Sequence, residues 1–226
     1  MNRISIIMPV LNEKAGVLGA SLVALKPLRM AGHEVIVVDG GSSDASRALA
    51  EKFADRLIFS APSRARQMNA GAAAASGEIL LFLHGDTFLP PSADTLIESG
   101  LETLGRGWGR FDVHLSGESP ALRVVEQAMN LRSRLTGIAT GDQAIFVRRA
   151  LFQTAGGFPD LALMEDVAMS TRLKRFGPPL CLKSRVVTSS RRWEENGILR
   201  TIFLMWGLRL AFALGVDPDK LARIYH

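Results

Sequence analysis

The chain has 226 residues, 47% of them hydrophobic, and a formal net charge of +5. This length and composition allow one substantial core, so we predict a single domain over residues 1–226. The only cysteine, Cys181, excludes an intramolecular disulfide framework and a cysteine-rich zinc cluster. We find no cleavable signal at the start of the chain, so the expected location is cytoplasmic. The positive charge favours anionic partners, but without a recognisable nucleic-acid-binding module we expect no nucleic acid.

Strand-like and helix-like segments alternate at the start of the chain. Residues 3–10 and 35–38 are short apolar runs rich in β-branched residues, and a helix is expected between them over 14–31. Such a βαβ unit has parallel strands, so the loops that follow both strands emerge at the same edge of the sheet. Ligands bind at that edge in open α/β sheets.

The alternation continues along the chain. The expected elements are a helix to about Phe53 capped by Ser43 or Asp44, a strand over 57–59, a helix over 65–75, a strand over 78–83, a helix from Ser92 to about Leu104, a strand pair near 110–115, a strand over 141–148 and a helix opened by Glu165 and Asp166. This order predicts an α/β fold with a mostly parallel central sheet flanked by helices.

Three acidic clusters follow expected strands or open a helix, namely Asp39, Asp86 and the pair Glu165–Asp166. Each could be a turn former or helix cap, but three at one edge favour a shared site. Asp39 is placed to contact a base or ribose, and Asp86 offers oxygen ligands for a metal ion that holds two phosphate groups. His84 is either a neighbouring ligand or a core histidine. The pair at 165–166 either serves as a general base or only complements the helix dipole.

Five runs occur in a characteristic order: 5–13 (SIIMPVLNE), 37–44 (VVDGGSSD), 69–71 (NAG), 76–86 (SGEILLFLHGD), and 156–158 (GGF) followed by Glu165–Asp166. This set resembles the family 2 glycosyltransferases, which have the GT-A fold. The resemblance implies inverting, metal-assisted transfer of a sugar from a nucleotide-diphosphate donor to a hydroxyl acceptor. It also implies a half for the nucleotide sugar over 1–115, an acceptor and catalytic half over 116–197, and an apolar C-terminal helix over 198–226.

The resemblance assigns roles to individual residues of this chain. It makes Asp166 the general base, supported by Glu165, and makes Asp86 a ligand of Mn²⁺ or Mg²⁺ with His84 beside it. The residues implied to bind the nucleotide sugar are Pro9, Leu11, Asn12, Glu13, Asp39, Gly41, Arg64, Arg66, Asn69, His84, Gly85 and Asp86. Those implied for the acceptor or the diphosphate are Gly141, Asp142, Gln143, Arg191, Arg192 and Trp193.

Three positions depart from the pattern of many relatives. Gly40 stands where a second aspartate is usual, His84 begins the metal motif in place of an aspartate, and Ser189 replaces the glutamine of processive relatives. Two alternatives therefore stay open. One is a nucleotide-sugar-binding protein without catalysis; the other is a nucleotidyltransferase, which would need a Gly-rich, lysine-bearing loop that residues 9–13 lack.

Residues 198–216 form the most apolar stretch of the chain, interrupted by Arg200 and Arg209. Three interpretations stay open: docking at a membrane surface, packing onto the domain or onto a second copy in a homodimer, and a transmembrane span. The first would make the protein peripheral on the inner face of the membrane and would suit a lipid-linked acceptor.

Overall fold

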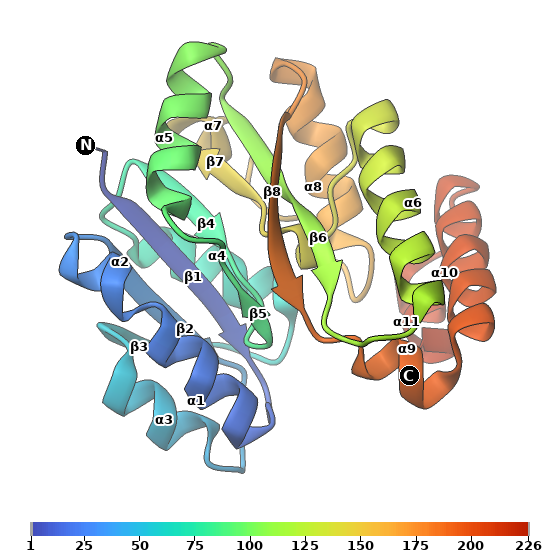
Figure 1. Cartoon of the computed structure of the whole chain (residues 1–226), viewed down its shortest axis with the longest axis horizontal. Coiled ribbons are helices and arrows are strands. Elements are labelled where there is room, and N and C mark those ends of the chain that lie inside the picture. The colour runs from blue at the N-terminus through green and yellow to red at the C-terminus, as the bar shows by residue number, and fades with distance from the viewer. Residues whose placement is uncertain (1, 226) are drawn as a thin grey trace.

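A computed structural model describes residues 2–225, so Met1 and His226 of the predicted domain lie outside the described residues. Its centre is an eight-stranded sheet with the strand order β3-β2-β1-β4-β7-β6-β8-β5 (Figure 1). The strands are β1 (Ile4–Val10), β2 (Glu34–Asp39), β3 (Arg56–Phe59), β4 (Ile79–Phe82), β5 (Thr87–Phe88), β6 (Trp108–Leu115), β7 (Phe146–Arg148) and β8 (Leu180–Thr188).

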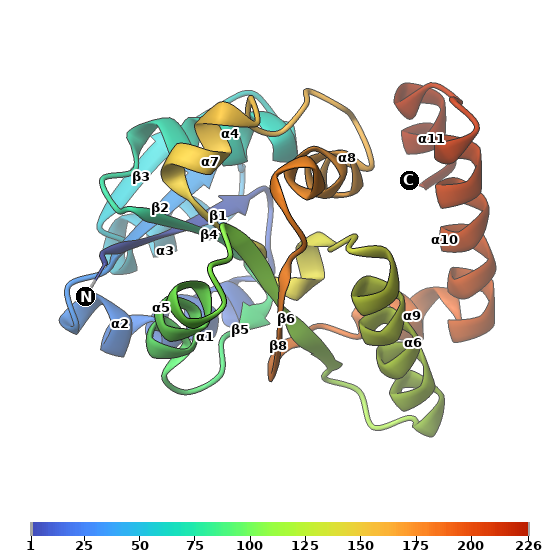
Figure 2. The same ribbon diagram turned by 90° about the horizontal axis from the view of Figure 1, so that it is seen from above.

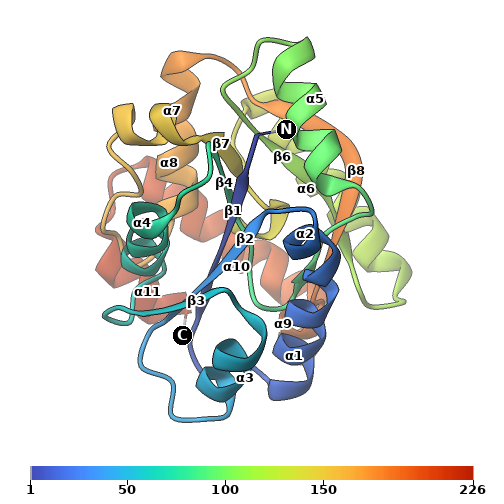
Figure 3. The same ribbon diagram turned by 90° about the vertical axis from the view of Figure 1, so that its left-hand side faces the viewer.

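Helices cover both faces of this sheet, with α1, α2 and α5 on one side and α4, α7 and α8 on the other (Figure 3). The α-helices are α1 (Ala15–Ala24), α2 (Lys26–Met30), α3 (Ser46–Phe53), α4 (Arg64–Ala74), α5 (Ala93–Thr103), α6 (Pro120–Thr136), α7 (Arg149–Thr154), α8 (Glu165–Leu173), α9 (Arg191–Asn196), α10 (Ile198–Ala213) and α11 (Pro218–Tyr225). Two short 3-10 turns are η1 (Gly141–Gln143) and η2 (Lys174–Phe176).

The sheet separates two apolar cores because successive strand residues point to opposite faces. Ile6 and Met8 of β1 pack with Leu18 of α1 in one core, whereas Ile7 packs with Met68 of α4 in the other. All residues of β1 and β2 are buried, as expected for central strands covered on both faces. The α/β class and the helix-flanked central sheet are therefore confirmed.

Parallel pairing brings the functional loops to one edge. β1 pairs in parallel with β2 and with β4, β2 with β3, and β6 with β8, whereas β7 runs antiparallel to β4 and β6, and β5 antiparallel to β8. Four of these seven pairings are parallel, as predicted. The loops after β1, β2 and β4 consequently emerge at one edge.

Three predicted elements need correction. The strand expected over 141–148 is confined to Phe146–Arg148, because Thr140 and Gln143 form a reciprocal capping box and Ala144 takes a left-handed φ of 47°. The strand pair near 110–115 is one continuous strand, β6. The helix over 14–31 is divided at Leu25, where Pro27 in the first turn of α2 has no N–H to continue α1.

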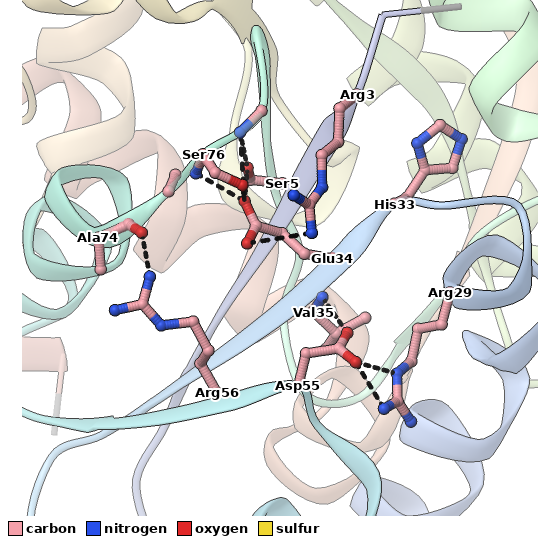
Figure 4. Close-up of polar contacts among 12 residues, drawn as sticks. Arg3, Ser5, Arg29, His33, Glu34, Val35, Asp55, Arg56, Ala74 and Ser76 are labelled. Atoms are coloured by element: carbon pink, nitrogen blue, oxygen red, sulfur yellow. Dashed lines mark hydrogen bonds and ion pairs between the residues drawn. The ribbon is translucent and has the colours of Figure 1, made fainter.

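A buried carboxylate ties the strands together at the edge opposite the functional loops (Figure 4). Glu34, 4% exposed, begins β2 and accepts hydrogen bonds from the hydroxyl of Ser5 and from the backbone N–H and hydroxyl of Ser76, both at 2.7 Å. Arg3 lies 3.8 Å from its other oxygen. Burial raises the pKa of Glu34, but the hydrogen bonds from Ser5 and Ser76 outweigh burial and hold it below its ordinary value.

The C-terminal stretch forms two helices, α10 and α11, beside α6 and α9 (Figure 2). Leu208 and Leu221 from these helices are buried against Met164, directly before α8. Part of the stretch thus packs onto the domain. Across residues 2–225, no helix has both the length and the apolar character that crossing a membrane requires.

Candidate functional site

A cleft with a volume of about 240 Å³ lies at the carboxyl ends of β1 and β4. Its walls come from the loops after these strands, the start of α8, the segment that follows β8, and α10. Thirteen of the twenty predicted site residues line it: Pro9, Glu13, Arg64, His84, Gly85, Asp86, Gly141, Asp142, Glu165, Asp166, Arg191, Arg192 and Trp193. Residues far apart in sequence therefore meet at the edge that the parallel strands predict.

Seven predicted residues do not line this cleft: Leu11, Asn12, Asp39, Gly41, Arg66, Asn69 and Gln143. Asp39 is 2% exposed, and its carboxylate accepts hydrogen bonds from the backbone N–H groups of Gly41 and Ser42. Asn12 accepts from the N–H of Ser43 at 2.9 Å. The Asn12 contact joins the loop after β1 to the loop after β2, and Leu11 beside it is exposed.

The other three lie in separate contacts. Arg66 pairs with Asp160 at 2.8 Å. Asn69 exchanges hydrogen bonds with the backbone of Phe158 at 2.8 and 3.0 Å, which ties α4 to the Gly-Gly-Phe turn. Gln143 is fully buried, and its side-chain oxygen accepts a 3.2 Å hydrogen bond from the backbone N–H of Thr140. Their predicted roles in ligand binding stay predictions.

The acidic pair stands at the first turn of α8, where the helix dipole favours negative charge. Met164 precedes it with a left-handed φ of 68°, a conformation that a non-glycine residue adopts only where its surroundings hold it. Burial, and then the charge of Asp166, raise the pKa of Glu165 to about 7. Asp166 itself accepts backbone hydrogen bonds from Gly141 at 2.8 Å and from Val167 at 2.7 Å. Two adjacent carboxylates thus occupy different environments, as acid–base chemistry requires.

His84 connects the β4 loop to the loop before β7. Its Nδ1 lies 3.4 Å from the carboxylate of Asp142. Burial raises the pKa of Asp142, but the hydrogen bond and charge of His84, followed by the charges of Arg64 and Arg209, outweigh it, and the pKa lies below its ordinary value. The other side of the ring faces Gly141, where a Cβ would lie 2.4 Å from Nε2. His84 is therefore held in place between the two loops.

Glu13 and Asp86 provide two further carboxylates. Burial, and then the charge of Asp86, raise the pKa of Glu13. The Glu13 side chain also packs 3.3 Å from where a Cβ on Gly85 would stand, so this glycine gives the carboxylate room beside the β4 loop. Among residues 2–225, no group of three or more His, Cys, Asp or Glu side chains is placed to hold a metal ion by itself.

Four arginines line the cleft: Arg64, Arg191, Arg192 and Arg209. Within the described part of the chain, none of them forms an ion pair with a carboxylate. Burial, and then the charge of Arg64, lower the pKa of Arg192, and burial lowers that of Arg209. Concentrated positive charge without an ion-paired carboxylate suits a ligand with several anionic oxygens.

Sequence reasoning missed several lining residues, and Arg209 is the most informative. It lies in the middle of the apolar helix α10, where burying a charged side chain costs free energy unless the charge is paired or binds a ligand. That local anomaly was the available signal. The remaining missed residues are Thr140, Leu163, Met164, Val167, Thr188, Ser189, Met205 and Tyr225, most of which have no sequence pattern that marks them.

A larger hollow of about 520 Å³ lies between α1, α2 and the segment from β5 to α5. Its lining is mainly apolar, and its carboxylate, Asp94, lies 3.2 Å from His33. Because acidic side chains, arginines and His84 line the smaller cleft together, we take that cleft as the candidate active site.

Comparisons with known proteins agree with this geometry. Residues 5–113 match the family model for glycosyl transferase family 2. The chain is 24% identical over 237 residues to a probable glycosyltransferase, YdaM, of Bacillus subtilis (strain 168), with 94% of this chain covered. It spans 55% of the length of that relative.

Solved structures show the same fold. S. aureus TarS 1–349 in complex with UDP-GlcNAc superposes with a TM-score of 0.67 at 19% identity, covering 83% of this chain and 58% of that one. The mannosyltransferase PcManGT from Pyrobaculum calidifontis, in complex with GDP-Man and Mn²⁺, gives a TM-score of 0.63 at 20% identity, covering 93% and 61%. The chain thus spans only a little over half of these proteins, and the likeness concerns the fold.

Proposed function

Since this chain belongs to glycosyltransferase family 2, we propose that it transfers a sugar from a nucleotide-diphosphate donor to a hydroxyl acceptor with inversion at the anomeric carbon. One observation carries the proposal: four arginines without carboxylate partners share a single cleft with the acidic residues of the β4 loop and of α8. This pairing of charges matches a reaction that expels an anionic diphosphate while a base removes a proton.

The arginines supply the binding of the leaving group. Guanidinium groups donate paired hydrogen bonds to phosphate oxygens, and partial burial strengthens them. We propose that Arg64, Arg191 and Arg192 hold the diphosphate, with Arg209 on the opposite wall. The negative charge that grows on the departing diphosphate would then be stabilised as the glycosidic bond breaks.

The fold family implies Mg²⁺ or Mn²⁺ at the same place, and PcManGT was solved with Mn²⁺. Asp86 suits such an ion, because within residues 2–225 its carboxylate accepts a single long hydrogen bond, from Thr87 at 3.4 Å, and it lies close enough to Glu13 to raise the pKa of that residue. Divalent cations of this kind are commonly held by one or two carboxylates together with substrate phosphates. We propose Asp86 as the protein ligand, with Glu13 and His84 beside it; when bound, the ion would neutralise charge on the diphosphate.

Asp166 is the proposed general base. Its two backbone hydrogen bonds fix the carboxylate at the cleft wall, and the second carboxylate beside it, Glu165, has a raised pKa. The acceptor hydroxyl would lose its proton to Asp166 while its oxygen attacks the anomeric carbon from the face opposite the diphosphate. We propose that Trp193, which lines the cleft, contacts a sugar ring of the acceptor or donor.

The proposal can be tested in two steps. The first is a thermal-shift panel of UDP, GDP, dTDP, CDP and their sugar conjugates, each with and without Mg²⁺ or Mn²⁺, because ligands of the native state raise its melting temperature. The second compares Asp166→Asn with Asp160→Asn, which lies outside the cleft in the Arg66 pair. We expect Asp166→Asn to abolish turnover of the donor identified by the panel while its thermal shift remains; Asp160→Asn should leave both unchanged.

Two results would contradict the assignment. Loss of ligand binding together with turnover in Asp166→Asn would count against Asp166 as the base. Binding of a nucleotide sugar without release of free nucleotide, with or without hydroxyl acceptors, would favour a binding protein without catalysis.

A further inference from the structure

Helix α10 exposes a continuous apolar stripe. Leu199, Phe203, Trp206 and Leu210 recur at spacings of three and four residues and are 71, 68, 63 and 63% exposed. Phe203 and Trp206 form an edge-to-face pair with ring centroids 6.4 Å apart. Large side chains are rarely left in water along an entire helix face without a partner.

Helix α6 carries a matching stripe. Val124, Leu131 and Leu135 are 68, 57 and 77% exposed, and Ala128 between them is also exposed. These four positions follow the same helical spacing as those of α10. Two neighbouring helices therefore each present an apolar row to solvent.

The two rows face the same side. Ile198 and Ile202 of α10 pack against the cluster that contains Val125 of α6, and at the other ends of the helices the charge of Arg209 acts on Arg132. The helices thus run in the same direction, as Figure 1 shows. In α6, the exposed Val124 comes one position before Val125, which lies at the contact with α10. In α10, the exposed Leu199 and Phe203 come one position after Ile198 and Ile202, which lie at the contact with α6. On parallel right-handed helices, these opposite offsets turn both rows to the same side.

The charge of this surface is one-sided. Within helix α6, turn η2 and helix α10, the exposed charged residues are all basic, namely Lys174, Arg175 and Arg200, whereas the single acidic residue, Glu126, is 3% exposed. Lys174 of η2 donates to the carbonyl of Thr136 at 2.5 Å, which places this basic turn at the C-terminal end of α6. Exposed carboxylates lie beyond the ends of these helices, with Glu118 before α6, Glu194 and Glu195 before α10, and Asp217 and Asp219 after α10.

We propose that the α6–α10 face is a docking surface for an anionic lipid bilayer. Apolar rows that include tryptophan and phenylalanine, surrounded by arginine and lysine, are typical of proteins that lie in the headgroup region. A second copy of this chain fits less well, because a symmetric contact would bring the same basic residues together without carboxylates to pair with them.

Docking in this way would place the cleft at the lipid surface. Met205 and Arg209, on the inner side of α10, line the cleft, while Phe203 and Trp206 lie on its outer side. An acceptor embedded in the bilayer would then be within reach of the candidate active site. The docking surface itself does not depend on the proposed transfer reaction and can be tested without it.

The experiment is co-sedimentation of the purified chain with vesicles of phosphatidylcholine alone or mixed with phosphatidylglycerol. We expect about tenfold stronger partition onto the mixed vesicles, weakening at high salt because the attraction is screened. Trp206 is exposed whereas Trp108 is 1% exposed, so binding should shift tryptophan emission to the blue. Trp206→Phe should keep the binding and lose most of the shift.

Charge-insertion variants locate the surface. We expect an about tenfold loss of vesicle binding in each of two double variants, Phe203→Glu/Trp206→Glu and Leu131→Glu/Leu135→Glu. Each variant places two carboxylates in the face that would contact the bilayer. The matched control is Val23→Glu/Met30→Glu, whose exposed residues lie on α1 and α2, away from this face. Melting temperatures confirm that every variant is folded.

Three results would overturn the proposal. These are equal partition onto neutral and anionic vesicles, equal loss of binding in the control, and a concentration-dependent dimer that the face variants convert to monomer. The last would assign the surface to a second copy of the chain.

Discussion

The carboxylate of Asp166 accepts a 2.8 Å hydrogen bond from the backbone N–H of Gly141. This contact joins the first turn of α8 to η1 across 25 residues of sequence, and on the other side of Gly141 stands the ring of His84. The proposed base, the loop before β7 and the loop after β4 are therefore mechanically linked. Moving one of these three groups should therefore displace the other two.

Gly141→Ala tests this linkage. The added Cβ would lie 2.4 Å from Nε2 of His84, far inside contact distance, so the ring must leave its present position beside Asp142 or the loop must shift. We expect transfer activity to fall about tenfold or more through lost positioning. Gly16→Ala is the control, because its Cβ would meet nothing within 4 Å and alanine favours helix α1 by about 0.5–1 kcal/mol. Unchanged activity in Gly141→Ala would show that His84 is not positioned through this contact.

Glu165→Gln should change how stability depends on pH. A carboxyl group whose pKa rises from 4.5 to about 7 on folding stabilises the folded state when protonated, and this contribution is lost as pH rises through 7. Glutamine does not titrate, so above pH 7 the free energy of unfolding of the variant should exceed that of the parent by on the order of 2 kcal/mol. Near pH 4 the two should be equal. Unfolding in urea at both pH values measures the difference. An equal effect at the two pH values would contradict the raised pKa.

Arg209→Met should separate stability from binding. Methionine replaces the unbranched apolar stem of the arginine side chain and removes a half-buried cation whose Nε is buried without a hydrogen-bond partner among the described residues. We expect the free energy of unfolding to stay the same or rise by about 1 kcal/mol, while affinity for the nucleotide diphosphate falls about tenfold. Arg200→Met, on the exposed side of the same helix, should change neither. Calorimetric titration that finds equal affinity in Arg209→Met would remove this residue from the site.

Glu34→Gln should destabilise the protein at neutral pH. The amide oxygen of glutamine can still accept from Ser5 and Ser76, but the negative charge is lost and the amide NH2 group would take the place of the oxygen that faces Arg3, at a cost of about 1–3 kcal/mol. Because the pKa of Glu34 is lowered, its contribution is present above pH 4.5 and is lost as pH falls. The difference in free energy of unfolding between parent and variant should therefore become smaller at acidic pH.

Glu51→Gln is the matched control for this carboxylate, since Glu51 forms an exposed pair with Arg47. That change should cost less than about 0.5 kcal/mol at any pH. A similarly small cost in Glu34→Gln would mean that the buried network contributes little to stability.

Much of the cleft could be predicted from the chain alone. The apolar runs at 3–10, 35–38 and 78–83 identify central strands, and the polar residues after them must emerge at one edge once the strands are parallel. Asp86 and the pair Glu165–Asp166 were expected at this shared edge, and the family resemblance implied Glu13 and His84 at the same site; all five line the cleft. Asp39 shows the limit of this reasoning: it ends β2 at the same edge, but its carboxylate accepts hydrogen bonds from nearby backbone N–H groups and it does not line the cleft.

What the sequence determines by itself is local: which runs are apolar enough to be strands, which residues open helices, and the order in which they come. The tertiary structure decides what depends on separate segments meeting: the short β7 after the Thr140–Gln143 box, Arg209 in the cleft wall, and the common outward direction of the α6 and α10 rows. Hydrophobic periodicity reports the side of an element that is buried, but it contains no information about which distant element covers that side. Packing supplies that information, because it brings segments together and sets the direction that each remaining side chain faces.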